Sequence, residues 1–232
     1  MKVALIDSCG VWAGAVAATR FSSTERGIER CEPLPDPTGH GAHIARILSA
    51  QERGGDARRP LLLLAQVFSG PAPATAAAVA AAIDWACTQG AELIHLSLGL
   101  HADRAVLSRA VAEALGARVL LVAAAPARGA TVFPAAYAGV IAATGDARCG
   151  PRELSVLGPR LFGGCPRFIA DPLEQAKALT PRGGASAGAA WVSRAILDLP
   201  ADARACVVER LSARARYFGR ERRADSTSEP TG

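Results

Sequence analysis

Three residues that are widely separated along the chain have the types and the neighbours that nucleophilic catalysis requires. Asp7 ends an apolar run, His40 lies between two glycines, and Ser186 follows the sequence Gly-Gly-Ala. A serine hydroxyl is a poor nucleophile at neutral pH, so it needs a base within hydrogen-bond reach and a buried carboxylate that orients this base. The sequence therefore predicts an acid, a base and a nucleophile in the chain order Asp, His, Ser.

Each of these residues also has an ordinary structural role when it is taken alone. Ser186 could cap an Ala-rich helix, His40 could start a helix with its ring satisfied locally, and Asp7 could form a turn after a strand. A further alternative is a metal site made by Asp7, His40 and His43. One catalytic zinc needs three ligands that converge on one point. Histidines three residues apart at a helix start do not converge on one point without further structural support. The occurrence of all three segments together favours the nucleophilic set.

The three segments resemble those of subtilisin-like serine proteases, the subtilase family, and the resemblance covers roughly residues 1–200. It implies an α/β fold of three layers, with a central, mostly parallel sheet flanked by helices. It also implies a serine endopeptidase that forms an acyl-enzyme on Ser186. Ser97, Leu98 and Gly99 match the family's substrate-binding segment, which would pair with an extended peptide by strand addition.

The resemblance also indicates a specificity pocket and a departure from the family's oxyanion site. Ala124 and Ala125 look like part of the strand that walls the pocket for the side chain before the scissile bond. Where the family has Gly-Asn, this chain has Ala127 and Arg128. In a subtilisin, loss of the Asn donor costs about 10² to 10³ in turnover. The expected replacements are the backbone N–H of Ser186 and the Arg128 side chain, with a bridging water as a third option.

Short apolar runs alternate with helical patterns along the chain, which is typical of a parallel sheet. Buried strands are expected at residues 3–6, 61–67, 93–96 and 119–124. Helices are expected at residues 74–89 and 102–115, from His40 with Ile44, Ile47 and Leu48 on one buried face, and from Ser186 toward Leu199. Residues 145–184 are rich in Gly and Pro and are expected to form surface loops and short strands around the cleft.

The length of 232 residues suits one sizeable core, so we expect a catalytic domain at residues 1–219 and a polar, disordered tail at residues 220–232. Trp191 is expected in the core, and His43 is expected to be structural. No acidic cluster has the spacing of a calcium loop, and the 6 cysteines occur singly, without a histidine at metal-ligand spacing. We therefore expect neither a metal nor another cofactor.

Composition and the first residues also bear on location and partners. Single cysteines favour reduced thiols, and a core strand directly after Met1 and Lys2 leaves no room for a signal peptide, so a cytoplasmic location is expected. The net charge of +5 comes with no basic stripe interleaved with aromatic residues, which argues against nucleic acid. The apolar runs are too short to span a membrane. The expected partner is a peptide or protein substrate.

These observations predict a compact serine endopeptidase. It is similar to small bacterial subtilases that remove a leader peptide from a modified partner protein. The alternative is a pseudoprotease that holds a peptide in the cleft without cutting it, and Ala127 motivates this alternative.

Overall fold

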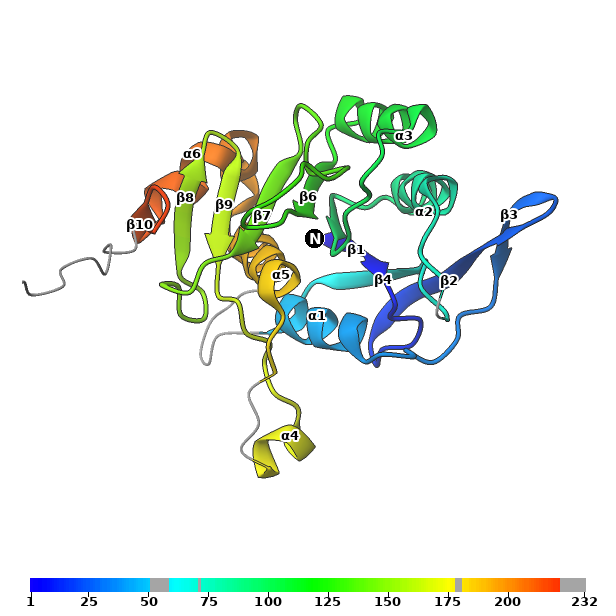
Figure 1. Cartoon of the computed structure of the whole chain (residues 1–232), viewed down its shortest axis with the longest axis horizontal. Coiled ribbons are helices and arrows are strands. Elements are labelled where there is room, and N and C mark those ends of the chain that lie inside the picture. The colour runs from blue at the N-terminus through cyan, green and yellow to red at the C-terminus, as the bar shows by residue number, and fades with distance from the viewer. Residues whose placement is uncertain (51–58, 71, 178–180, 222–232) are drawn as a thin grey trace, which may run out of the picture.

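The computed structural model describes residues 1–50, 59–70, 72–177 and 181–221 of the chain. Within these residues, one ten-stranded sheet has the spatial order β10-β8-β9-β7-β6-β5-β1-β4-β2-β3 (Figure 1). The strands are β1 (Lys2–Asp7), β2 (Ala15–Thr24), β3 (Gly27–Cys31), β4 (Leu61–Gln66), β5 (Leu93–Leu96), β6 (Leu120–Ala124), β7 (Ile141–Gly145), β8 (Leu154–Gly158), β9 (Leu161–Gly164) and β10 (Tyr217–Phe218).

Most neighbouring strands of the sheet run parallel. β1 pairs in parallel with both β4 and β5, and the parallel pairing continues through β6, β7 and β9. The antiparallel pairs are β2 with β3 and β8 with β9. The four strands expected from the apolar runs are β1, β4, β5 and β6, which lie at the centre of the sheet. The predicted mostly parallel α/β sheet is confirmed.

Helices cover both faces of the sheet (Figure 1). They are α1 (His40–Ser49), α2 (Ala76–Thr88), α3 (Ala105–Gly116), α4 (Pro172–Ala176), α5 (Gly184–Leu197) and α6 (Val207–Ala213), with a 3₁₀ turn at Ala201–Cys206. One apolar core lies between the sheet and α1, α5 and α6, and a second lies between the sheet and α2 and α3. Among the described residues, no helix is both long and apolar enough to cross a membrane.

Two expectations about the second half of the chain need correction. Helix α5 begins at Gly184, so Ser186 lies inside its first turn and does not cap it. The stretch 145–184 does contain short strands, but β8 and β9 extend the sheet, and Leu154 and Phe162 are core residues rather than surface ones. Glycine and proline residues interrupt the apolar pattern of this stretch. In addition, strands this short have too few side chains to show the alternation that identifies a strand. The hairpin β2–β3 and helix α6 were not predicted either.

Helix α5 packs closely on the sheet because Gly188 has no side chain. A Cβ atom at this position would lie 2.0 Å from the carbonyl oxygen of Thr144, at the end of β7. Trp191, one turn further along α5, is 3% exposed, so its predicted core position is confirmed. Gly188 therefore determines how near α5 comes to the carboxyl ends of the central strands.

His95 is a buried polar residue in the middle of β5. Its Nδ1 lies 2.9 Å from Ser193 Oγ on α5, and its Nε2 lies 2.5 Å from Ser97 Oγ. The side chain is completely buried. Burial lowers the pKa of His95 from 6.5 to about 4, because removal from water disfavours the charged ring. A neutral imidazole thus connects α5 to the segment that follows β5.

Replacement of Gly188 by Ala should destabilise the fold. The new methyl group would collide with Thr144 backbone that belongs to the sheet and cannot move aside cheaply. We expect a loss of about 3 kcal/mol in the free energy of unfolding, measured by denaturant titration. Gly116→Ala is the matched control, since no atom lies within 4 Å of its added Cβ. Equal losses in both variants would contradict this role of Gly188.

His95 should make the protein sensitive to acid. Because its pKa is about 4 in the folded state and 6.5 when the ring is exposed to water, the unfolded chain binds a proton that the folded chain does not. The stabilising effect of a neutral His95 is complete above pH 6.5 and is lost as the pH falls toward 4. We expect His95→Asn to reduce the difference in unfolding free energy between pH 7.5 and 4.5 by about 2 to 3 kcal/mol. Urea titrations at the two pH values would measure this, and an unchanged difference would contradict it.

Candidate active site

Asp7 lies at the carboxyl end of β1, where the central parallel strands end. The residue is 1% exposed, and its Oδ1 accepts hydrogen bonds from the backbone N–H of Ser8 at 2.6 Å and from the Ser8 hydroxyl at 3.0 Å. Oδ1 also lies 2.8 Å from Nδ1 of His40. The other oxygen, Oδ2, is buried and has no hydrogen-bond partner among the described residues. A carboxylate in this position orients the imidazole and favours its protonated form.

His40 is the first residue of α1, and a tight loop presents it to Asp7. Gly39, before the helix, has a φ of 72°, a conformation that glycine adopts without strain. Asp36 holds this loop: its Oδ1 accepts from the N–H of Gly39 at 2.9 Å, and its Oδ2 accepts from the N–H of Ala42 at 2.9 Å. Gly41 allows α1 to approach β1, since a Cβ there would lie 2.4 Å from Cys9 N. The loop therefore positions the ring before any substrate arrives.

The charges around His40 raise its pKa. Burial alone would lower the pKa of His40, but the hydrogen bond and the charge of Asp7, together with the charge of Asp36, raise it above 6.5. Burial likewise works against ionisation of Asp36, but the hydrogen bonds that it accepts lower its pKa. The site thus holds a histidine with increased basicity, which suits a group that takes a proton.

Ser186 lies in the first turn of α5, half-buried, with its hydroxyl donating to the carbonyl oxygen of Ser97 at 3.4 Å. In the first turn of a helix the backbone N–H groups have no partner inside the helix. Among the described residues, no hydrogen bond joins Ser186 Oγ to His40. Such contacts are often long in enzymes without substrate, and they tighten when substrate binds.

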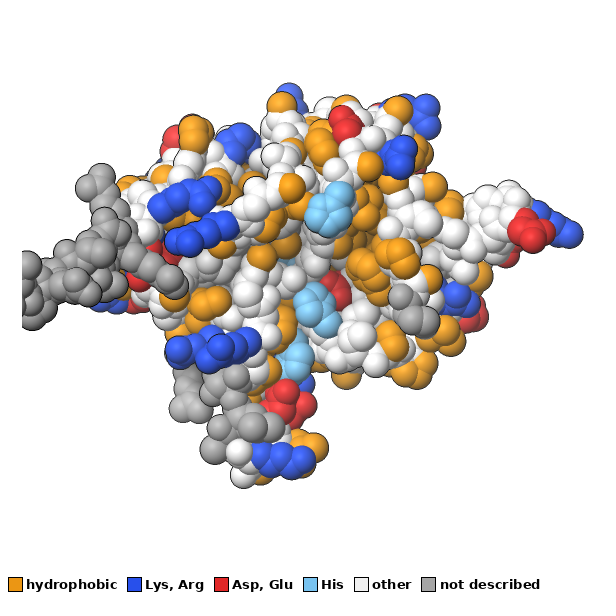
Figure 2. Space-filling view, in the orientation of Figure 1, with side chains coloured by type: hydrophobic (Ala, Val, Ile, Leu, Met, Phe, Trp, Pro, Cys, Tyr) orange, Lys and Arg blue, Asp and Glu red, His pale blue; other side chains and the backbone are white. Residues whose placement is uncertain are grey.

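Two cavities meet at Ser97 and bring the three predicted catalytic residues to one groove. A cavity of about 530 Å³ is lined by Asp7, His40 and Ser97, and one of about 380 Å³ is lined by Ser97 and Ser186. The second cavity is also lined by residues predicted to bind substrate: Leu98, Gly99, Ala124 and Ala125. Histidine side chains follow a hollowed strip of this face (Figure 2). Strands β1, β5 and β6 and helices α1 and α5 all end or begin along this groove.

The loop after β6 has an alanine, Ala127, at the position where an oxyanion donor was expected. Ala127 has no side-chain donor, and its carbonyl oxygen accepts from Arg220 Nη1 at 2.7 Å. The exposed Arg128 lines the cavity that contains Ser186 and also the adjacent cavity beside Asp146. Arg220 therefore contacts the site although the sequence assigned it to the tail. The rest of that predicted tail, residues 222–232, lies outside the described residues.

His43 contacts Phe168 and helix α4. Its ring stacks on Phe168 at 4.9 Å and 7°, and its Nε2 lies 3.3 Å from Glu174 Oε1 on α4. Phe168 also meets the His40 ring edge-on, at 5.6 Å and 84°. In the described part of the chain, no group of three or more His, Cys, Asp or Glu side chains is placed to hold a metal ion. His43 therefore braces Phe168, and the two histidines do not converge as zinc ligands would.

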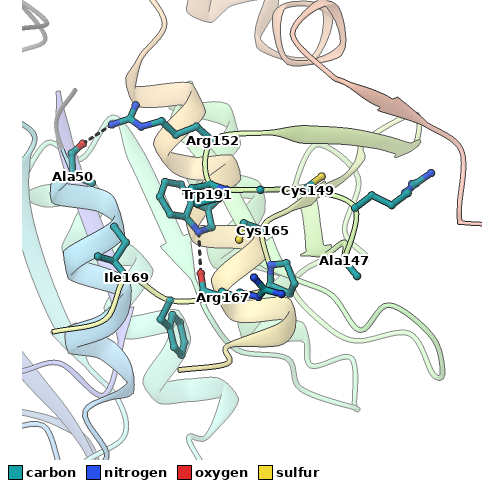
Figure 3. A pocket seen from close by; sticks show the side chains of 13 residues that line it. Ala50, Ala147, Cys149, Arg152, Cys165, Arg167, Ile169 and Trp191 are labelled. Carbon is teal, nitrogen blue, oxygen red and sulfur yellow. Dashed lines mark hydrogen bonds between the residues drawn. The ribbon is translucent and has the colours of Figure 1, made fainter. Parts of the chain in front are cut away.

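A larger cavity lies elsewhere, between the end of α1, the middle of α5 and residues 147–152 (Figure 3). It measures about 660 Å³, and Trp191 and Cys165 are among its lining residues. The Trp191 Nε1 donates to the Arg167 carbonyl at 3.1 Å along one wall. None of the predicted catalytic or substrate-binding residues lines this cavity. Its size alone therefore does not make it the active site.

A second Ser–His pair, Ser193 with His95, cannot perform the same chemistry. Both side chains are fully buried in the core. A peptide substrate could not reach Ser193 without opening the sheet. His95 also contacts Ser97, which lines the groove, but the His95 ring is completely buried. Ser186 and His40, by contrast, both line the groove.

Sequence reasoning missed Asp36 and Phe168 as parts of the site. Asp36 holds the loop before His40, and its place ahead of a helix start in Asp-Pro-Thr-Gly-His was a usable signal, since acidic side chains favour helix N-termini. Phe168 had no such signal, because its contact with His40 spans most of the chain. Long-range packing of this kind leaves no local pattern.

Comparison with protein families matches the subtilase family over residues 19–197. This range includes His40 and Ser186 and begins after Asp7. The thermostable alkaline protease of Halalkalibacterium halodurans is 32% identical over 133 residues, which cover 54% of this chain and 37% of that protein. The minor extracellular protease Epr of Bacillus subtilis is 30% identical over 156 residues, covering 61% of this chain and 23% of Epr. The chain thus spans less than half the length of these curated relatives.

Solved structures share the same fold. The prenylagaramide maturation protease PagA superposes with a TM-score of 0.59 at 23% identity, over 84% of this chain and 73% of that one. The self-cleaved protease domain of PatA gives a TM-score of 0.60 at 22% identity, over 88% and 80% of the two chains. Because the family match covers residues 19–197 of the 232, the chain belongs to the subtilase family.

Proposed function

We propose that the protein is a serine endopeptidase in which Ser186 is the nucleophile, His40 the general base and Asp7 the carboxylate that orients His40. The observation that carries this proposal is the 2.8 Å hydrogen bond between Asp7 and His40, beside a groove that Ser97 shares with Ser186. Nδ1 of His40 is occupied by Asp7, so Nε2 is left to accept the serine proton. This is the tautomer that a base for serine attack requires.

The proposed reaction follows from this arrangement. Ser186 Oγ attacks the peptide carbonyl carbon while its proton passes to His40 Nε2. His40 then gives that proton to the leaving amine as the peptide bond breaks, which leaves an acyl-enzyme on Ser186. Water then releases the acyl group, with His40 again taking and returning a proton. We expect backbone groups of Ser97 and Gly99 to hold the peptide in an extended form beside the serine.

The oxyanion of the tetrahedral intermediate needs a donor other than Ala127. We propose the backbone N–H of Ser186 as one donor, because the first turn of α5 leaves that N–H free of helix bonds. The sequence-based prediction that Arg128 also donates stays a prediction. A site with fewer donors would be slow, which suits an enzyme that cuts a single substrate.

We further propose that the substrate is the leader peptide of a modified precursor. Two solved neighbours, PagA and PatA, share the fold, and PagA is described as a maturation protease. The sequence also resembles the maturation protease of quinohemoprotein amine dehydrogenase. All six cysteines are free, which supports a reducing compartment such as the cytoplasm. Gene neighbours that encode a short leader-bearing peptide would identify the substrate.

A fluorophosphonate should label Ser186 if His40 activates it. We expect one adduct per chain by intact-mass analysis, located on Ser186 by peptide mapping. Ser186→Ala should abolish labelling, and His40→Ala should slow it by about 10⁴-fold or more. Ser108→Ala, the same change on helix α3, is the matched control. No adduct on the wild-type protein at any pH would favour the pseudoprotease.

The labelling rate should rise with pH as His40 loses its proton. The raised pKa of His40 places the midpoint above 6.5, despite the opposing effect of burial. In Asp7→Asn the ring loses its charged partner, so we expect the midpoint to move to lower pH and the rate to fall by about 10⁴-fold. Asp36→Asn, which removes a more distant charge and one of the two oxygens that hold the loop before His40, should shift the midpoint less. An unchanged midpoint in Asp7→Asn would contradict the proposed pairing.

A further inference from the structure

The cavity beside Ser186 has small, uncharged walls and one cationic side chain. Ala124, Ala125 and Gly99 line it, and Gly99 packs so closely on Val132, another lining residue, that a Cβ there would lie 2.8 Å from it. Arg128 is the charged side chain on its rim, and none of its described lining residues is acidic. The volume of about 380 Å³ has room for a peptide side chain.

Arg128 has no hydrogen-bond or ion-pair partner among the described residues, and it is exposed at the end of the cavity. The loop that carries it is held in place, because Arg220 donates to the adjacent Ala127 carbonyl at 2.7 Å. The opposite wall is held by Leu100 and Phe133, whose backbones exchange two hydrogen bonds of 2.7 and 2.8 Å. An unpaired guanidinium is therefore presented by a fixed loop.

Nearby acidic groups do not neutralise Arg128. Asp146, on the far side of the same loop, accepts from Arg148 Nη2 at 2.7 Å and from Ser155 Oγ at 2.6 Å. Glu221 lines that same second cavity. The pKa of Arg148 is raised mainly by its hydrogen bond to Asp146, with a smaller contribution from the charge of Glu221. The cavity beside Ser186 thus has a positive rim without an internal counter-charge.

We propose that this cavity binds an acidic side chain, Asp or Glu, of the residue that precedes the cleaved bond, with Arg128 as its partner. The inference rests on the proposed function, because Ser186 attacks the carbonyl of that residue and its side chain then lies nearest the cavity. A guanidinium matches a carboxylate with two parallel N–H···O bonds, and such charge-assisted bonds are stronger than neutral ones. His101, on the cavity rim, adds a second donor.

The test uses peptide diphenyl phosphonates, which label an activated serine and carry a chosen side chain at the residue before the phosphorus. Two probes differ only in Glu or Gln at that residue, and the second-order labelling rate of Ser186 is measured by intact mass. We expect the wild type to prefer Glu over Gln by about tenfold at 0.1 M salt and less at 1 M, because salt screens exposed charges.

Substitutions of Arg128 should change this ratio. In Arg128→Ala the Glu:Gln ratio should fall to about one, and in Arg128→Glu it should fall below one because like charges repel. Arg26→Ala, which removes one positive charge at the distant β2–β3 hairpin, should keep the wild-type ratio. Preserved folding of each variant is checked by its thermal midpoint.

The possible failures can be told apart. A wild-type ratio near one, with Ser186 labelled by both probes, would overturn the acidic preference and leave the proposed protease standing. An equal loss of rate with both probes in Arg128→Ala, at an unchanged ratio, would instead place Arg128 at the oxyanion and overturn the inference. No labelling by either phosphonate or by a fluorophosphonate would overturn the proposed function and this inference with it.

Discussion

The hydrogen bond between a buried carboxylate and a half-exposed imidazole is the interaction on which the rest of the site depends. Asp7 is 1% exposed, so its charge requires hydrogen-bond donors from the protein, and Ser8 and His40 provide them. The bond joins the end of β1 to the start of α1. The absence of a side chain at Gly41 permits this approach, and Asp36 holds the loop that carries His40. The charge pairing of Asp7 with His40 therefore depends on the position of α1 and on the geometry of the loop that precedes it.

Topology explains why residues so far apart in the chain share a groove. The carboxyl ends of neighbouring parallel strands lie along one edge of the sheet, where α/β folds place their binding sites. β1 ends in Asp7, and β5 leads directly to Ser97. Helix α5 brings Ser186 to the same edge because Gly188 allows it to lie against β7. The groove is thus a consequence of strand order together with the close packing of one helix.

Two histidines on neighbouring elements show how environment decides protonation. His40 lies beside a carboxylate, and its pKa is raised despite burial. His95 lies in the centre of β5, with only hydroxyl partners at its ring nitrogens, and burial lowers its pKa to about 4. The first ring is more basic than an ordinary histidine, whereas the second stays neutral at neutral pH and connects α5 to the segment after β5. The same residue type therefore has the basicity that the proposed proton transfer needs in one place, and serves architecture in the other.

The family, the central parallel strands and the main helices could be predicted from the sequence, because motifs, apolar runs and helix-stop glycines are local signals. Asp7, His40 and Ser186 could also be named as candidates, because Asp7 ends an apolar run and the other two closely follow glycines. The hydrogen bond between Asp7 and His40, the place of β8 and β9 in the sheet, and the contact of Phe168 with His40 could not be predicted and come from the tertiary structure. The contact of Arg220 with the loop carrying Arg128 is of the same kind. These contacts join segments that are far apart in the sequence. Folding and burial bring the segments together, so the types of neighbouring residues do not reveal such contacts.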